Sequence, residues 1–184
     1  MEENHYVHMR SNSSQKQKGR DLSGMKEKKN ISFRLGTEED SGLVTQLICE
    51  LAEYEKLLDQ VTTDEEKVRR SMVNGEFEVL FACLDDGTVA GYAMFFPDYA
   101  SLVGKQGMYL ENIYVRPEYR GMGIGEMIMK ELIRISNERG YAKMEWHCLD
   151  WNDPANSLYL KFGTEQKLDW IYYRLSQGDL DRLR

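Results

Sequence analysis

Three glycines occupy alternate positions, Gly121, Gly123 and Gly125, directly after Arg120 and directly before a run of helix formers. Glycine lets the backbone turn tightly with its amides exposed, and the start of a helix adds the positive end of the helix dipole. With the charge of Arg120, these features favour a phosphate or pyrophosphate. A dinucleotide fingerprint is excluded because Glu126 stands where a glycine is required, and no P-loop Gly-Lys-Ser/Thr follows. A turn that merely joins a strand to a helix is the alternative.

Other reactive residue types point to few further sites. Cys49, Cys83 and Cys148 are scattered and never in C-x-x-C spacing, so neither a disulfide framework nor a zinc site is predicted, and no metal is expected. His147 is a candidate base, although a single histidine on a strand is more often a hydrogen-bonded structural group.

Length and composition limit the class of protein that could carry these candidate residues. A chain of 184 residues with 41% hydrophobic residues fits one domain with a real core. A formal net charge of -7 argues against nucleic acid or an anionic membrane as partner and is compatible with a small cationic substrate. No apolar run reaches the roughly 20 residues of a membrane span and the first residues lack a signal peptide, so a cytoplasmic location is expected.

The chain divides into a polar extension and a folded domain. Residues 1–30 are rich in Ser, Asn, Gln, Lys and Glu, with almost nothing to bury, and are predicted to be disordered. Residues 31–184 are predicted to form the domain.

Hydrophobic periodicity and turn signals predict the order of elements within this domain. Thr37 and Thr63 are predicted helix caps, and residues 85–88 a hairpin turn. Strands are predicted at 31–37, 77–84, 89–96, 107–116, 142–149 and 167–176, and helices at 42–57, 64–73, from the glycine run to about 139, and at 153–162. The strand–helix–strand crossover from 110 to 148 implies a parallel pair, so we expect a mixed α/β sheet with helices on both faces.

The segment from Arg120 to Gly125 resembles the R/Q-x-x-G-x-G/A signature of the GNAT superfamily of N-acetyltransferases. Three further segments, ELAEYE (50–55), YLENIYV (109–115) and WNDPANSLYLKFG (151–163), are similar to its diamine branch, the spermidine/spermine and thialysine acetyltransferases. The resemblance covers about three quarters of the chain. It implies the GNAT fold, a mostly antiparallel central sheet whose parallel pair is splayed at the acetyl-coenzyme A (acetyl-CoA) site.

The resemblance also implies which residues hold acetyl-CoA. Backbone amides of the strand segment Ile113–Val115 would also stabilise the oxyanion. Asn152 or Asp153 would by itself serve as a helix cap, and both roles are compatible. The implied coenzyme residues are Ile113, Tyr114, Val115, Arg120, Gly121, Met122, Gly123, Ile124, Gly125, Glu126, Asn152, Asp153, Pro154, Ala155 and Tyr159.

Two residues match catalytic positions of the family. Glu111 would hold the substrate ammonium and receive its proton, through a water. Tyr159 would be the general acid for the departing thiolate. Without the resemblance, Glu111 is an ordinary polar strand residue and Tyr159 an aromatic packing residue.

For the amine, the resemblance implies Tyr54, Glu55, Glu111, Glu145, Trp146 and His147. Tyr54 on residue pattern alone is equally a core residue. The chain departs from the polyamine enzymes at residues 98–105, where it lacks their acid and tryptophan. The implied activity is therefore direct transfer from acetyl-CoA, in a ternary complex, to a small diamine or thialysine-like amino acid. A polyamine acetyltransferase, a peptide or protein N-acetyltransferase and a non-catalytic coenzyme A module are the alternatives, and relatives imply a homodimer.

Overall fold

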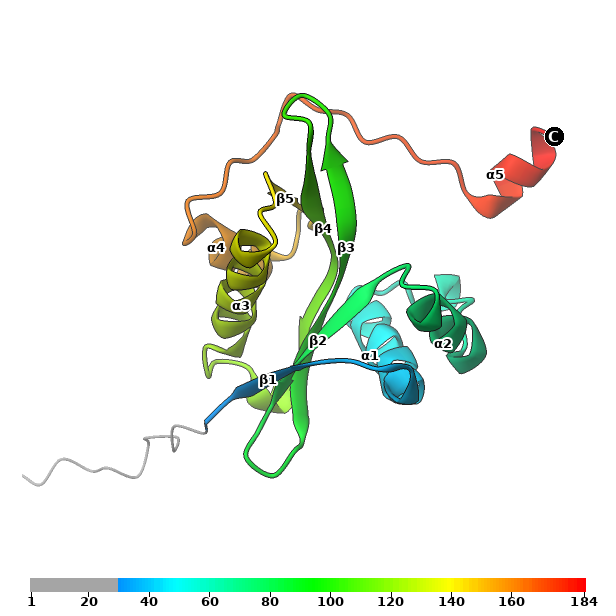
Figure 1. Cartoon of the computed structure of the whole chain (residues 1–184). Coiled ribbons are helices and arrows are strands. Elements are labelled where there is room, and N and C mark those ends of the chain that lie inside the picture. Colours follow the sequence, from blue (N-terminus) through cyan, green and yellow to red (C-terminus); the bar gives the residue numbers. More distant parts are fainter. Residues whose placement is uncertain (1–29) are drawn as a thin grey trace, which may run out of the picture.

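The computed structural model describes residues 30–184, so the predicted disordered extension lies, apart from Asn30, outside the described residues. Figure 1 shows the elements in chain order. They are β1 (Ser32–Leu35), η1 (Glu38–Asp40), α1 (Ser41–Tyr54), η2 (Leu58–Gln60), α2 (Glu65–Val73), β2 (Glu78–Cys83), β3 (Val89–Ala100), β4 (Lys105–Val115), η3 (Pro117–Tyr119), α3 (Ile124–Glu138), β5 (Met144–Glu145), α4 (Asp153–Leu160) and α5 (Gln177–Arg182).

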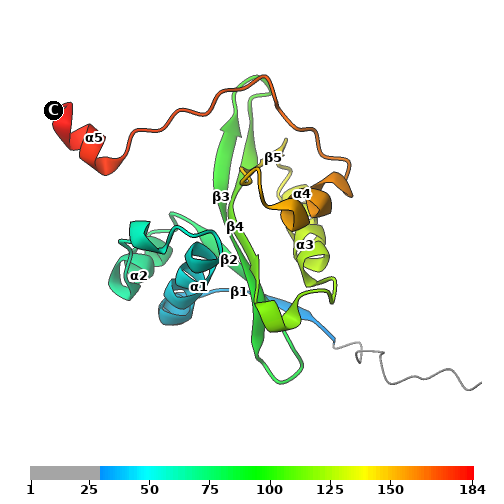
Figure 2. The same cartoon turned by 180° about the vertical axis from the view of Figure 1, so that it is seen from behind.

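The strands form one sheet in the order β1-β2-β3-β4-β5. The pairs β1–β2, β2–β3 and β3–β4 are antiparallel, and β4–β5 is parallel. Helices α1 and α2 cover one face of the sheet, and α3 and α4 lie on the other (Figures 1 and 2). The predicted mixed, mostly antiparallel sheet with helices on both faces is confirmed.

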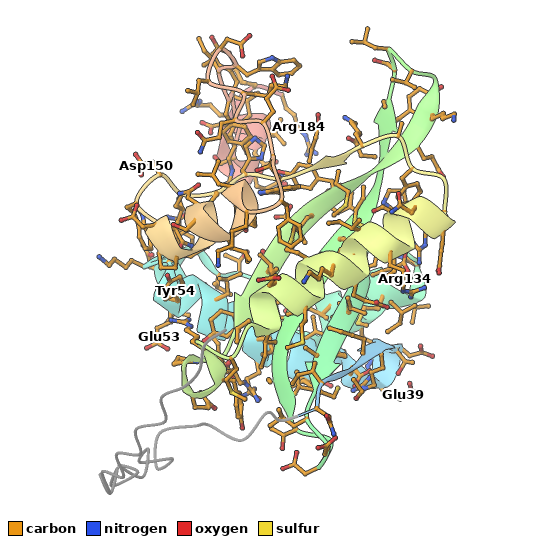
Figure 3. All side chains as sticks on the ribbon, turned by 90° about the vertical axis from the view of Figure 1, so that its left-hand side faces the viewer. Glu39, Glu53, Tyr54, Arg134, Asp150 and Arg184 are labelled. Atoms are coloured by element: carbon orange, nitrogen blue, oxygen red, sulfur yellow. The ribbon has the colours of Figure 1, made fainter. Side chains whose placement is uncertain are left out.

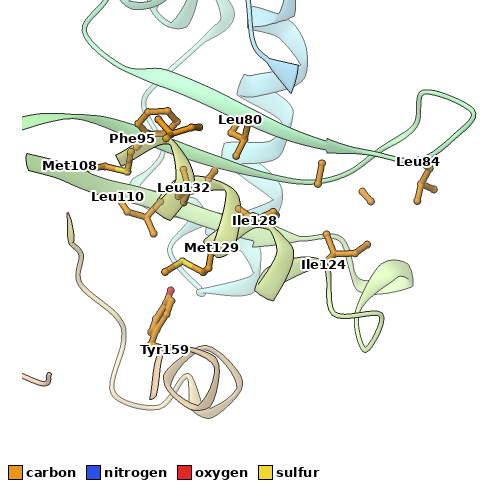
Figure 4. Packing of buried hydrophobic residues seen from close by; sticks show 14 residues of the cluster. Leu80, Leu84, Phe95, Met108, Leu110, Ile124, Ile128, Met129, Leu132 and Tyr159 are labelled. Carbon is orange, nitrogen blue, oxygen red and sulfur yellow. The ribbon is translucent and has the colours of Figure 1, made fainter. Parts of the chain in front are cut away.

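Each face of the sheet has its own core because the helices present apolar residues at helical spacing. Val44, Leu47 and Leu51 of α1 pack with Tyr92 and its neighbours on one face. On the other face Ile124, Ile128, Leu132 and Ile135 of α3 pack against β3 and β4, and Tyr159 of α4 joins them (Figure 4). Burial of each such side chain contributes about 1.5–3 kcal/mol, which fixes α3 and α4 against the sheet.

A β-bulge interrupts the β3–β4 ladder. Met94 pairs with Asn112 and Phe95 pairs with Leu110, so β4 carries one extra residue, Glu111, that has no partner on β3. Bulges bend a strand and re-aim its side chains. The bulge therefore lies at the residue that was predicted to be the catalytic carboxylate.

Several predicted elements differ in the structure. Asp64, whose side chain accepts from the Lys67 amide, caps α2, so the prediction of Thr63 was wrong. The predicted strand 142–149 pairs only at Met144–Glu145. Residues 97–106, where no strand was predicted, extend β3 and β4 into a long hairpin.

The predicted last strand, residues 167–176, is not a strand in the structure. It is extended chain that leaves the body of the domain and leads to α5 (Figures 1 and 2). A strand forms only where another strand supplies hydrogen-bond partners, and no strand among residues 30–184 pairs with it. We call residues 166–184 the C-terminal arm.

Within residues 30–184, no helix combines the length and apolar character needed to cross a membrane.

Candidate active site

A cleft lies between β4 and the chain that follows β5. The two strands pair only through Met108–Met144 and Tyr109–Glu145, after which they separate, as the predicted splayed pair requires. The bulged part of β4, the end of α1 and the start of α4 complete its walls. The lining residues are Leu51, Glu55, Leu110, Glu111, Asn112, Ile113, Trp146, His147, Cys148, Leu149, Asn152, Ala155 and Tyr159.

Both predicted catalytic residues line this cleft. Glu111 is solvent-exposed and enters from the bulge of β4. Tyr159 enters from α4, with its ring 5.0 Å from that of Trp146 and only 7% of its surface exposed. Figure 4 shows the tyrosine reaching from α4 toward Met129. Burial raises the pKa of the Tyr159 phenol, so the hydroxyl keeps its proton throughout the neutral range.

Glu55 supplies a second carboxylate to the cleft, from just beyond the end of α1. It is partly buried, and this burial raises the pKa of its carboxyl group. Among the described residues it has no ion-pair partner. A cationic group entering the cleft would favour its charged form.

The glycine loop has the geometry that the sequence predicted. Gly121 and Gly123 have φ of 76° and 79°, in the left-handed region, and a Cβ at either would meet only open space. The positive φ at these two positions therefore requires glycine. Gly125 differs, because it lies in α3 and a Cβ there would stand 3.3 Å from Leu158, so it serves contact between α3 and α4.

Arg120 was expected to add positive charge to a phosphate site, but its side chain is held by contacts with other residues of this chain. Its Nε donates to the Val115 carbonyl oxygen at 2.9 Å. Its guanidinium carbon lies 4.4 Å from the centre of the Tyr54 ring and 5.5 Å from that of Tyr114. The arginine thus stacks on two aromatic rings beside the glycine loop.

Asn152 and Tyr54 connect two walls of the cleft. The Asn152 side chain accepts from the Ala155 amide and caps α4, so the predicted cap is confirmed. The same oxygen accepts from the Tyr54 hydroxyl at 3.2 Å. Figure 3 labels Tyr54 at the end of α1, next to the α4 segment. Asp153 and Pro154 form the exposed first turn of α4.

The predicted substrate strand divides into residues inside and outside the cleft. Trp146 and His147 line it. The Tyr109 hydroxyl is hydrogen-bonded to His147 Nδ1, and the Tyr172 ring stands 4.8 Å from the imidazole, which agrees with a structural role. Glu145 does not line the cleft, and its carboxylate pairs with Lys143.

Some cleft residues were missed from the sequence. Asn112 donates to the Tyr92 hydroxyl at 3.2 Å, and its place in the wall follows from the bulge, which has no clear signal in the residue pattern. Cys148 packs against the α3 core and also lines the cleft, where burial raises the pKa of its thiol. In the part of the chain that the structure describes, no group of three or more His, Cys, Asp or Glu residues could hold a metal ion.

A second hollow, of about 390 Å³, lies between α1 and the end of β4. Arg116 closes one side with a bidentate ion pair to Glu50. Among the predicted site residues only Tyr114 lines it, so the candidate chemistry lies in the cleft.

The structure thus contains the split parallel pair, the glycine loop at a helix start, and the Glu111 and Tyr159 side chains in one cleft that were expected of an acetyltransferase. The chain belongs to the acetyltransferase (GNAT) family, whose model matches residues 45–164. It is 37% identical over 147 residues to thialysine N-epsilon-acetyltransferase of Bos taurus, covering 73% of this chain and 84% of that protein.

Two further comparisons agree with this class. Thialysine N-epsilon-acetyltransferase of Caenorhabditis elegans is 32% identical over 150 residues, which cover 82% of this chain and 89% of the relative. The structure of a ribosomal-protein-alanine N-acetyltransferase from Brucella melitensis has a TM-score of 0.65 at 20% identity, covering 80% of this chain and 99% of that one. This structural likeness concerns the fold alone.

Proposed function

We propose that this protein transfers an acetyl group from acetyl-CoA to a primary amine of a small diamine or thialysine-like amino acid, by direct attack in a ternary complex. The observation that carries the proposal is the cleft that brings together Glu111, Glu55 and Tyr159. The relatives named as thialysine acetyltransferases support the choice of amine.

The glycine loop fits the phosphates of acetyl-CoA. The open space around Gly121 and Gly123 and the first-turn amides of α3, which no side chain caps, suit a pyrophosphate. The amides of Ile113 to Val115 lie on β4 where it has left β5, which suits the pantetheine and the oxyanion. When bound, acetyl-CoA supplies a thioester that an amine can attack.

The two carboxylates prepare the amine. An alkylammonium has a pKa of about 10.4, so at neutral pH it arrives charged and must lose a proton before it attacks. Glu55 and Glu111 both face the cleft and attract this cation. We assign the proton to Glu111, through a water, because its exposed carboxylate has solvent beside it.

Tyr159 serves the leaving group. Its hydroxyl has no hydrogen-bond partner among the described residues, so it is available to a sulfur that departs in the cleft. Because burial keeps its pKa above that of a free phenol, the proton moves only together with cleavage of the carbon–sulfur bond.

The experiment that tests the function measures thiol release from acetyl-CoA with thialysine and with spermidine, at matched concentrations and across pH. We expect release with both amines to depend on enzyme and to be faster with thialysine. Faster release with spermidine would show that the changed residues 98–105, which form the tip of the β3–β4 hairpin, do not exclude polyamines. The specificity would then rest with Glu55.

Two other functions give different results in the same assay. A peptide or protein N-acetyltransferase would release thiol with a lysine peptide and not with small amines. A non-catalytic coenzyme A module would bind acetyl-CoA without turnover on any amine. The presence of both Glu111 and Tyr159 in one cleft speaks for catalysis.

Cys49, Cys83 and Cys148 are all free, which supports the proposed cytoplasmic location.

We further propose a homodimer in which the C-terminal arm packs on a second copy. Trp170, Tyr172 and Tyr173 of the arm are 77%, 66% and 83% exposed, and Ile171 is 74% exposed. Apolar side chains at both odd and even positions suit a strand covered on both faces. Aromatic side chains bury about 150–250 Å² each, so two arms approach the roughly 1,200–2,000 Å² of a stable interface.

The arm is tested by the double substitution Ile171→Asp with Tyr173→Asp. We expect sedimentation equilibrium to give a dimer for the unaltered protein and a monomer for the variant, because two buried carboxylates would oppose docking. Leu102→Asp, at the fully exposed hairpin tip, is the matched control and should stay dimeric. A variant that remains a dimer would contradict the role of the arm.

A further inference from the structure

Tyr54 is the centre of a network that joins three segments distant in sequence. Its hydroxyl donates to Asn152 at the start of α4. One face of its ring carries the Arg120 guanidinium, 4.4 Å away, from the loop that precedes α3. Its ring centre lies 6.0 Å from that of Trp151, and Lys56 Nζ stands 5.7 Å from the Trp151 ring.

These contacts leave Tyr54 poorly suited to receive a substrate ammonium. A cation binds an aromatic side chain at the ring face, within about 6 Å of its centre. Arg120 already occupies that position with a permanent positive charge, and a second cation beside it would be repelled. The hydroxyl is likewise committed to Asn152. Tyr54 does not line the cleft, whereas its neighbour Glu55 does.

The partners of Tyr54 belong instead to the two sides of the proposed coenzyme site. Arg120 precedes Gly121 and Gly123, the loop that suits the pyrophosphate. Asn152 caps α4, the helix that carries Tyr159. A link between these segments fixes the position of the loop relative to the helix, and the proposed coenzyme site depends on both.

We propose that Tyr54 is a positioning residue for acetyl-CoA and not a ligand of the amine. It holds the glycine loop and the α4 cap in one arrangement before the coenzyme binds, which removes part of the ordering cost of binding. The inference rests on the proposed use of acetyl-CoA. It assigns amine recognition in this region to Glu55 alone.

Two substitutions separate the two contacts of Tyr54. Tyr54→Phe keeps the ring under Arg120 and removes only the hydrogen bond, and Tyr54→Leu removes both. A hydrogen bond contributes about 0.5–1.5 kcal/mol, so calorimetry should show acetyl-CoA bound about 2–10-fold more weakly by the Phe variant. The Leu variant should bind more weakly still. The KM for the amine, at saturating acetyl-CoA, should stay within about twofold of its original value.

Tyr141→Phe removes a hydroxyl that accepts from Arg139 beyond the end of α3, outside the cleft; it is the matched control and should change neither quantity. Circular dichroism and thermal denaturation verify that each variant is folded. An increase of amine KM with unchanged acetyl-CoA affinity would overturn the inference, as would equal losses of both. Failure of the unaltered protein to bind acetyl-CoA would instead refute the proposed function, so the two failures are distinguishable.

Discussion

Replacement of Tyr159 by phenylalanine should lower kcat by about 10²–10⁴-fold, the usual contribution of a positioned general acid. The ring is buried against Trp146 and the α3 core, and phenylalanine preserves this packing. Only the proton donor is lost. Calorimetry should therefore give an unchanged affinity for acetyl-CoA, while stopped-flow thiol release shows the loss of turnover.

The same variant distinguishes catalysis from packing. If Tyr159 only fills space, the variant should keep its activity, since a phenyl ring fills the same volume. Loss of activity together with loss of thermal stability would also count against a purely catalytic role. Tyr141→Phe removes a hydroxyl that accepts from Arg139 outside the cleft and should leave kcat unchanged.

Replacement of Glu111 by glutamine should lower kcat/KM about 10²-fold near pH 7, because the carboxylate no longer accepts the ammonium proton. The loss should shrink as pH rises toward the amine pKa of about 10.4, since free amine then arrives without needing a base. A pH profile of kcat/KM for both proteins gives this measurement.

A loss that is the same at every pH would assign Glu111 to binding of the ammonium instead. Glu76→Gln, an exposed carboxylate beyond α2, should leave the pH profile unchanged and is the control. Glutamine keeps the size of the side chain, so the bulge of β4 is preserved in the variant.

Local patterns predicted most of the sheet and helices. Leu47 and Leu51 of α1, and the buried apolar residues of α3, recur at helical spacing. This spacing is a reliable signal because it places one face of each helix in a core. The glycine loop was predictable because positive φ at Gly121 and Gly123 is a local requirement.

The remaining features depend on contacts that the sequence does not contain locally. Residues 167–176 have the composition of a strand, but a strand also needs a partner, and the described part of the chain pairs none with it. Thr63 and Asp64 are both good caps, and only the geometry of the first turn decides between them. For Tyr54 the resemblance implied an amine ligand and the residue pattern allowed a core residue. Tyr54 does pack against the core on the α1 side, but its contacts with Arg120 and Asn152 join distant segments and have no local signal in the sequence.

The bulge at Glu111 has a consequence for insertions and deletions in β4. Before it, Met108 and Leu110 face the α3 core; after it, Ile113 and Val115 do so, while Tyr114 faces the α1 core. The extra residue thus reverses the alternation of the strand. A one-residue deletion there would make Leu110 and Asn112 consecutive, and because they pair with Phe95 and Met94, which face opposite sides, Ile113 and Tyr114 would keep their present faces. Straightening β4 while keeping all of its residues would instead exchange the two faces of the segment that follows, so the bulge is what allows Glu111 to be present without reversing that segment.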